Sequence, residues 1–309
     1  MATRTSYRSV SSGGIDFESV PMRLFQKAKK LGVWDPMAID LAQDRLDWEA
    51  LPSARRDDLI GTTTLFQAGE EAVTLDLLPL VLAVARAGRL EEEIYLTSFL
   101  WEEAKHTEFF RRWLDLVPAV KGEDLHEYMG PNYKRLFFVE LPEAMGRLLE
   151  DSSNVALARA LVTYNMMIEG VLAETGYYSY GKQLERGRLF PGLARALRLI
   201  SRDESRHIRF GVYMLQLLIS EDARMWEVVQ GRMQELLPLV LGVVGPAPDD
   251  PPLPNDSVFA ASPDEMVGFA TAQYARRVKV LERARGQARR DLEREVGEEL
   301  TEEFFAGPA

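Results

Sequence analysis

The sequence predicts an all-α fold, and two observations lead to this prediction. Apolar residues recur at helical spacing through long stretches of the chain, whereas alternating runs of β-branched residues are too short to predict strands. Two Glu-x-x-His motifs, at residues 103–106 and 204–207, lie within such helical stretches. Because helices of this length exceed the average for globular proteins, we expect a bundle of long helices around a central site.

The composition indicates a soluble globular protein, since 46% of the 309 residues are hydrophobic and 28% are charged. The net charge of −11 argues against binding to nucleic acid or to an anionic membrane surface. Cysteine is absent, which excludes disulfides and thiolate metal sites and fits a reducing cytosol. The start of the chain is polar, and the longest apolar run, residues 77–85, is too short to span a bilayer. We therefore expect a cytoplasmic protein without stable membrane insertion.

Capping residues predict where the first helices of the chain begin. Residues 1–30 are expected to form a flexible N-terminal arm, since the first twenty are rich in Ser and Gly. A helix is expected to begin at Pro36, with Asp35 as its N-cap, and to run to about Leu51. Pro52 and Ser53 then start the next helix.

The rest of the chain predicts further helices and one long loop. The segment 245–263 holds six prolines and is expected to be extended. Ser262 and Pro263 open another helix, and the charged tail, 282–303, is expected to be helical or frayed and peripheral. We read residues 31–244 as one domain and residues 245–309 as a Pro-rich loop with a C-terminal helical appendage. The helices in between are expected over about 53–84, 89–117, 131–150, 154–186, 188–219 and 221–243.

Each Glu-x-x-His motif follows a lone glutamate at a similar interval. Glu70 precedes Glu103 by 33 residues, and Glu169 precedes Glu204 by 35. A single Glu-x-x-His is often a salt-bridged helix surface, but this repeated pattern is the ligand set of ferritin-like bundles that hold two metal ions. The sequence therefore predicts a ferritin-like four-helix bundle core with additional helices and a dinuclear metal site inside it.

Helix faces decide between adjacent glutamates. Glu70 lies on an almost wholly apolar stripe, whereas the stripe through Glu71 is wetter. Glu103 likewise shares an apolar stripe with His106, whereas Glu102 shares its side with polar residues. Four glutamate carboxylates crowded together inside a bundle need a positive counter-charge, and carboxylate with imidazole ligands suits iron or manganese. The predicted metal ligands are Glu70, Glu103, His106, Glu169, Glu204 and His207.

Other residues lie near these ligands in the predicted bundle. Val73, one turn beyond Glu70, and Tyr164, five residues before Glu169, are candidates for oxidation or ordinary core residues. Asp203 is a candidate to accept a hydrogen bond from a ligand histidine, unless it lies on the surface. Tyr177 is expected to serve packing or electron transfer, and His126 to lie on the surface.

The sequence resembles the small subunit of class I ribonucleotide reductase over residues 30–220. The matching residues include Trp34, the segment 44–48 (DRLDW), Asp203 and the six predicted ligands. Three segments look more narrowly like the ligand-binding oxidases related to that subunit. They are AGEEAVT at 68–74, EEAKHTEFFRRWLD at 102–115 and YNMMIEGVLAETGYY at 164–178.

This resemblance implies a manganese/iron cofactor, with a di-iron pair as the alternative. Glu70, Glu103 and His106 would hold manganese and Glu169, Glu204 and His207 iron, with two carboxylates bridging. It also implies a long-chain fatty acid whose carboxylate lies on the metals, and an ether cross-link between Val73 and Tyr164. Trp34 and Asp203 would match residues of an electron-transfer chain. We also expect a homodimer.

Two departures separate the chain from a reductase subunit. The radical-tyrosine position falls at Phe110, and no tyrosine follows Tyr274, so the tail lacks the residue that relays a radical to a catalytic partner. We therefore favour an oxygen-dependent oxidase that performs two-electron oxidation on an unknown natural substrate. The alternatives are a radical-generating reductase subunit without the radical tyrosine, and a metal or lipid carrier without enzymatic activity.

Overall fold

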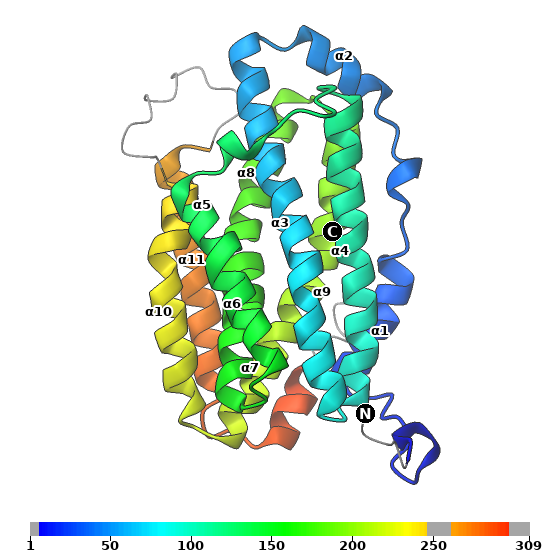
Figure 1. The fold of residues 1–309 in the computed structure, drawn as a ribbon, viewed down its shortest axis with the longest axis vertical. Helices are drawn as coiled ribbons and strands as arrows, with labels where there is room; N and C mark the ends of the chain where they lie inside the picture. Colours follow the sequence, from blue (N-terminus) through cyan, green and yellow to red (C-terminus); the bar gives the residue numbers. More distant parts are fainter. Residues whose placement is uncertain (1–5, 246–260, 297–309) are drawn as a thin grey trace.

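The computed structural model describes residues 6–245 and 261–296. Within these residues the fold is helical without strands, and the predicted all-α class is confirmed. The long helices run nearly side by side along one axis of the molecule (Figure 1). The described helices are α1 Val20–Leu31, α2 Ala42–Ala50, α3 Ser53–Arg86, α4 Leu90–Leu116, α5 Pro131–Arg135, α6 Leu141–Gly146, α7 Asn154–Leu161, α8 Glu174–Gly187, α9 Pro191–Glu221, α10 Met225–Val244 and α11 Pro263–Arg283.

Four long helices enclose the centre of the bundle: α3, α4, α9 and a continuous helix that runs from α7 into α8. The middle of that continuous helix, Val162–Ala173, is a π-helix, so each backbone N–H bonds to the carbonyl five residues earlier. The predicted extents of these four helices agree with the structure to within a few residues. Helical periodicity located them, but it did not indicate the change of pitch inside the continuous helix from α7 to α8.

The predicted helix over 131–150 is divided into shorter pieces. Between α5 and α6 lies a π-helical turn, Leu136–Glu140, and a 3₁₀ turn, Arg147–Leu149, follows α6. These pieces still follow one another as a single helical segment beside α3 (Figure 1).

The prediction of one continuous helix from Pro36 to Leu51 is wrong, because the chain forms two separate helices there. Asp35 caps a short 3₁₀ helix, Pro36–Ala38, by accepting a hydrogen bond from the Met37 amide. The backbone is then extended at Ile39, and α2 begins only at Ala42. This break turns α2 toward the start of α9. There Asp44 accepts hydrogen bonds from the backbone N–H groups of Gly192 and Leu193, at 2.8 and 2.9 Å, and Asp47 accepts one from that of Phe190.

The expected flexible arm over residues 1–30 is wrong for residues 20–30, which belong to α1, and residues 1–5 lie outside the described residues. Val20, Leu24 and Ala28, spaced four residues apart, form a buried stripe on α1, and this helix packs against α4 and α9. Nearer the start of the chain, Arg8 makes a bidentate ion pair with Glu91 at 2.6 and 2.9 Å.

The C-terminal part packs on the bundle. Ser262 caps α11 as predicted, by accepting a hydrogen bond from the Glu265 amide, and α11 lies along α10 and the π-helix (Figure 1). Leu292 and Val296 of the charged tail are buried in the main core, so this part of the tail is not peripheral. Most of the expected Pro-rich loop, residues 246–260, lies outside the described residues.

One described helical stretch, Asn154–Lys182, is long and apolar enough to cross a membrane. However, 78% of its most apolar window is buried inside the bundle. Its composition is therefore that of a core helix.

Candidate metal centre

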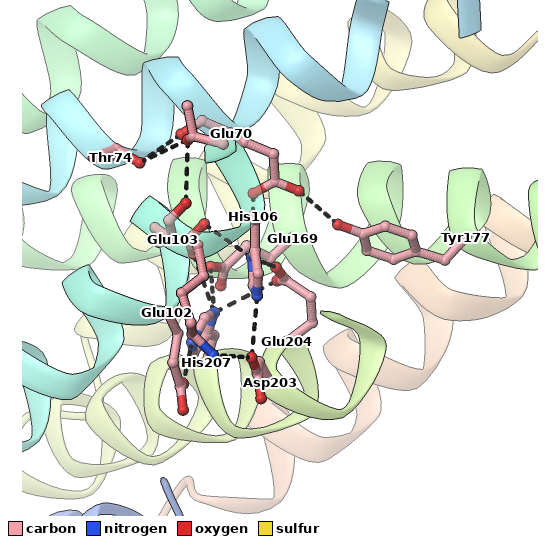
Figure 2. Close-up of polar contacts among 12 residues, drawn as sticks. Glu70, Thr74, Glu102, Glu103, His106, Glu169, Tyr177, Asp203, Glu204 and His207 are labelled. Carbon is pink, nitrogen blue, oxygen red and sulfur yellow. Dashed lines mark hydrogen bonds and ion pairs between the residues drawn. The ribbon is translucent and has the colours of Figure 1, made fainter. Parts of the chain in front are cut away.

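The structure brings the six predicted ligands together in the middle of the bundle. Each of the four central helices contributes to the cluster, and all six side chains are buried (Figure 2). Glu70 comes from α3, Glu103 and His106 from α4, Glu169 from the π-helix, and Glu204 and His207 from α9.

The ligand atoms form two overlapping groups. Glu70 and His106 belong to the first group, Glu169 and His207 to the second, and Glu103 and Glu204 to both. Within each group, one ligand atom from every residue lies within 4.8 Å of the others. Two adjacent cations bridged by the shared carboxylates would satisfy this arrangement.

Unpartnered polar atoms show that the cluster fits metal ions. Among the buried atoms of the six ligands, four have no hydrogen-bond partner: Glu103 Oε2, His106 Nδ1, Glu169 Oε1 and His207 Nδ1. The two histidine atoms face carboxylates, with His106 Nδ1 at 3.2 Å from Glu204 Oε1 and His207 Nδ1 at 3.1 Å from Glu103 Oε1. Buried polar atoms normally have partners, so these four atoms are available for coordination.

Protons compensate the charge of the metal-free cluster. Burial, opposed in part by His106, raises the pKa of Glu70 to about 8, and burial together with Glu204 raises the pKa of Glu169 well above its usual range. Burial disfavours the charged form of His106, but Glu70 and the other carboxylates outweigh this effect and raise its pKa. Protons are thus held where cations would bind.

Both histidines are oriented by carboxylates on the opposite helix. His106 Nε2 lies 3.2 Å from Asp203 Oδ2, and His207 Nε2 lies 2.9 Å from Glu102 Oε2 (Figure 2). Arg206 donates to both carboxylates, at 2.5 Å to Asp203 and 2.6 Å to Glu102. These bonds leave Nδ1 of each histidine as the coordinating atom.

Glu102 shares its side of α4 with polar residues as expected, but this polar side is largely buried, and the Glu102 side chain is 0% exposed. α1 and α9 both pack against α4, so a second face of α4 is covered. A sequence signal was present, since an acidic residue directly precedes the ligand glutamate in both motifs, as Glu102 does in one and Asp203 in the other. Glu71, by contrast, is exposed as expected.

Asn165 also contacts the cluster and was not predicted. Its amide donates to Glu169 Oε2 at 2.7 Å. This contact needs Gly211 on α9, because a Cβ there would lie 2.2 Å from the Asn165 Cβ.

The other predicted residues contact the ligands or lie beside them. Tyr164 Oη donates to Glu103 Oε1 at 3.1 Å and Tyr177 Oη to Glu70 Oε1 at 2.9 Å. The π-helix matters here, because residues five apart, such as Tyr164 and Glu169, are about 140° apart around an α-helix but close to one turn apart in a π-helix. Trp34 Nε1 donates to Asp203 Oδ2 at 2.7 Å, and His126 is exposed as expected.

An apolar cavity of about 260 Å³ adjoins the ligands. Four ligand carboxylates lie on its wall, and Tyr177 and Val73 line it as well. The remaining wall is largely apolar and includes Leu65, Phe66, Phe137, Ile168, Leu172 and Met266.

The chain is similar to known proteins along most of its length. Residues 22–239 match the family model described as ribonucleotide reductase, small chain. A solved variant of an R2-like ligand-binding oxidase with an anaerobically reconstituted Mn/Fe cofactor is 38% identical, with a TM-score of 0.82 over 90% of this chain and 98% of that chain. A second variant, with an aerobically reconstituted Mn/Fe cofactor, is 36% identical, with a TM-score of 0.83 over 90% of this chain and 99% of that one.

Proposed function

The chain belongs to the ribonucleotide reductase small-chain family, within which it groups with the R2-like ligand-binding oxidases, and we propose that it is an O2-activating oxidase with one manganese and one iron ion. One observation carries this proposal: six buried ligands form two overlapping groups, and the four glutamates among them lie on the wall of an apolar cavity. The absence of cysteine fits a reducing cytosol, where we place the protein.

Glu70, Glu103 and His106 would hold manganese, and Glu169, Glu204 and His207 would hold iron. Glu103 and Glu204 would be available to both ions, because they belong to both groups. When bound, the two ions supply part of the electrons that reduce O2. Tyr177, Asn165, Asp203 and Glu102 hold the ligands in place through hydrogen bonds.

The apolar cavity suits a long-chain fatty acid whose carboxylate faces the ligand cluster. The four glutamates on the wall offer this carboxylate no cation of their own, so the bound metal ions would supply the positive charge that holds it. The rest of the wall is largely apolar and matches a hydrocarbon chain.

Val73 and Tyr164 would form an ether cross-link when the metallated protein first meets O2. The Val73 Cβ–H and Tyr164 O–H bonds break, a C–O bond forms, and two electrons and two protons are released. Reduction of O2 to two waters takes up four electrons and four protons. Two electrons come from the cross-link and two from the metal ions, and the other two protons come from solvent. Tyr164 is suited to this step by its hydrogen bond to Glu103.

Intact mass spectrometry tests this function. The protein loaded with both metals and exposed to O2 should lose two hydrogen atoms, and Tyr164→Phe should abolish the loss. Tyr180→Phe is the matched control, because Tyr180 is also a buried tyrosine but is bonded to Thr63 instead of a metal ligand. An unchanged mass in the wild type would reject the cross-link.

The reductase alternative is supported by the hydrogen-bonded series Trp34, Asp203 and His106. It is disfavoured by Phe110, which is fully buried and stacked on Phe66 with the ring centroids 5.3 Å apart. Ribonucleotide reduction on mixing with a nucleotide-binding large chain would favour it. Absence of O2 uptake by the metallated protein would favour a lipid or metal carrier.

The homodimer stays a proposal as well. Leu75, Leu78 and Leu82 form an exposed apolar stripe along α3, which suits contact with a second copy. Analytical ultracentrifugation of the wild type and of a Leu75→Glu/Leu78→Glu variant tests it, and a monomeric wild type would reject it.

A further inference from the structure

The ammonium group of Lys105 lies between two tryptophan rings. Its Nζ is 4.4 Å from the ring centroid of Trp34 and 4.5 Å from that of Trp101. Lys105 is 5% exposed, whereas Trp101 is 46% exposed. Hydrogen bonds to the Gly32 carbonyl at 2.5 Å and to Asp203 at 3.1 Å fix the ammonium group in place.

These tryptophans connect the metal centre to the surface. Trp34 donates to Asp203, which contacts His106, and the rings of Trp34 and His106 also stack at 16° with centroids 6.1 Å apart. On the far side of Lys105, Trp101 reaches solvent. An oxidising equivalent produced at the metal centre therefore has two destinations, namely the apolar cavity and these two indoles.

A nearby positive charge opposes the loss of an electron from an indole, because the product is a radical cation. The repulsion is strong at about 4 Å where water is excluded, and salt screens a buried charge weakly. Asp203, which accepts hydrogen bonds from Trp34, Lys105 and Arg206, offsets part of this repulsion, and removal of Lys105 would leave its negative charge beside Trp34 with less compensation. The charge of Lys105 thus acts on Trp34 and Trp101 together.

We propose that Lys105 is a positioning residue that keeps Trp34 and Trp101 reduced, so that the oxidising equivalents of O2 are directed into the cavity. Without Lys105, one of the two indoles would transfer an electron to the metal centre and become a radical cation. Each such transfer would remove one oxidising equivalent from the two-electron oxidation in the cavity. The part of this proposal that directs oxidising equivalents into the cavity rests on the proposed function. The electrostatic effect of Lys105 on the two indoles does not depend on that function.

The first experiment uses the metal-free protein and is independent of oxidase activity. Azide radicals generated by pulse radiolysis remove one electron from indoles, and mass spectrometry of peptides identifies the oxidised tryptophans. Lys105→Met should increase oxidation at Trp34 and Trp101 on the order of tenfold, whereas Lys105→Arg, which keeps the charge, should match the wild type. Lys29→Met is the control, because Lys29 lies over the ring of Phe25 and not over an indole. Equal oxidation in Lys105→Met and the wild type would overturn the proposal.

The second experiment uses the protein loaded with manganese and iron. After mixing with O2, Lys105→Met should give a transient tryptophan radical by freeze-quench electron paramagnetic resonance and a smaller fraction with the two-hydrogen mass loss. Lys105→Arg should restore both results. A wild type without mass loss, together with the expected result in the metal-free protein, would reject the cross-link and leave the electrostatic role of Lys105 standing. If Lys105→Met does not fold, Lys105→Gln serves in both experiments.

Discussion

Glu102 and Asp203 tie the two helices that carry the histidines to each other. Glu102 on α4 contacts His207 on α9, and Asp203 on α9 contacts His106 on α4. Each histidine is therefore held by the acidic residue that precedes the ligand glutamate of the other helix. Displacement of one helix would misplace ligands on both.

Replacing Glu102 with Gln should weaken metal binding about 10–100-fold, because His207 loses the carboxylate that orients it and strengthens its Nδ1 as a ligand. Competition with a chromophoric chelator measures this affinity. Glu71→Gln is the control, because Glu71 neighbours a ligand but is exposed. Equal affinities in Glu102→Gln and Glu71→Gln would contradict the role of Glu102.

Metal affinity should rise with pH. In the metal-free protein His106 and His207 have raised pKa values, and the pKa of Glu70 is about 8, so all three carry protons at neutral pH. Metal ions must displace these protons, and binding is therefore favoured as pH increases through about 8. Titration calorimetry at pH 7 in buffers of different ionisation enthalpy should show proton release. Heats that do not depend on the buffer would contradict this reading.

At the residue scale, helix faces predicted Glu70 and Glu103 because one side of each helix carries an apolar stripe. The same rule separated Glu102 from the ligand stripe, but it did not predict that Glu102 is buried, since α4 is covered on a second side by α1 and α9. Asn165 was missed because its contact depends on Gly211, a small residue on another helix. Such contacts come from the assembled bundle and leave little pattern in the local sequence.

Among the elements, α2 shows how a short helix can position a long one. Asp44 accepts hydrogen bonds from two backbone N–H groups at the start of α9 and from the indole N–H of Trp113 on α4. Phe190, just before α9, has a left-handed backbone with φ of 53°, and its N–H bonds to Asp47. Capping signals predicted Asp35 because its partner is two residues away. They could not predict the break before α2, since the partners of Asp44 and Asp47 lie far along the sequence.

Asp44→Ala should lower the free energy of unfolding by about 2–4 kcal/mol, because buried backbone and indole donors lose their acceptor. Urea denaturation of the metal-free protein measures the change. Asp40→Ala is the matched control, since Asp40 is exposed and accepts one bond, from the Ala42 amide, so its loss should cost about 1 kcal/mol or less. Similar losses in the two variants would contradict the structural role of Asp44.

For the whole molecule, the metal centre joins the central helices through buried ionisable groups. Helical periodicity and the repeated motif predicted this bundle, because both follow from local spacing. They did not predict that α1 packs on α4 or that Leu292 and Val296 enter the core. Those contacts join segments far apart in the chain, and the charge of the tail concealed its two apolar residues.

Removal of both metals should lower the melting temperature, because the ions bind the folded ligand cluster and not the unfolded chain. Each site adds about 4 kcal/mol when free metal is 1,000 times its dissociation constant. Differential scanning calorimetry with and without a chelator measures the shift. The His207→Ala variant should lose most of the metal-dependent shift in melting temperature. The His126→Ala variant should keep this shift, because His126 is exposed and far from the ligands in the sequence. A melting temperature that does not respond to metal would contradict the site.

Because of the π-helix, the number of residues in the segment Val162–Ala173 is expected to matter for function. Removing a single residue between Tyr164 and Glu169 would let the backbone relax toward an α-helix, in which neighbouring residues are about 100° apart. Tyr164 and Glu169 would then lie four residues apart on one helical face, but every residue before the deletion would turn relative to those after it. Helix α7 would lose its register with α10, or Tyr177 would lose its register with Glu70. Insertions and deletions in this segment are therefore expected to be far less tolerated than substitutions, which a length-scanning library selected for metal binding would reveal.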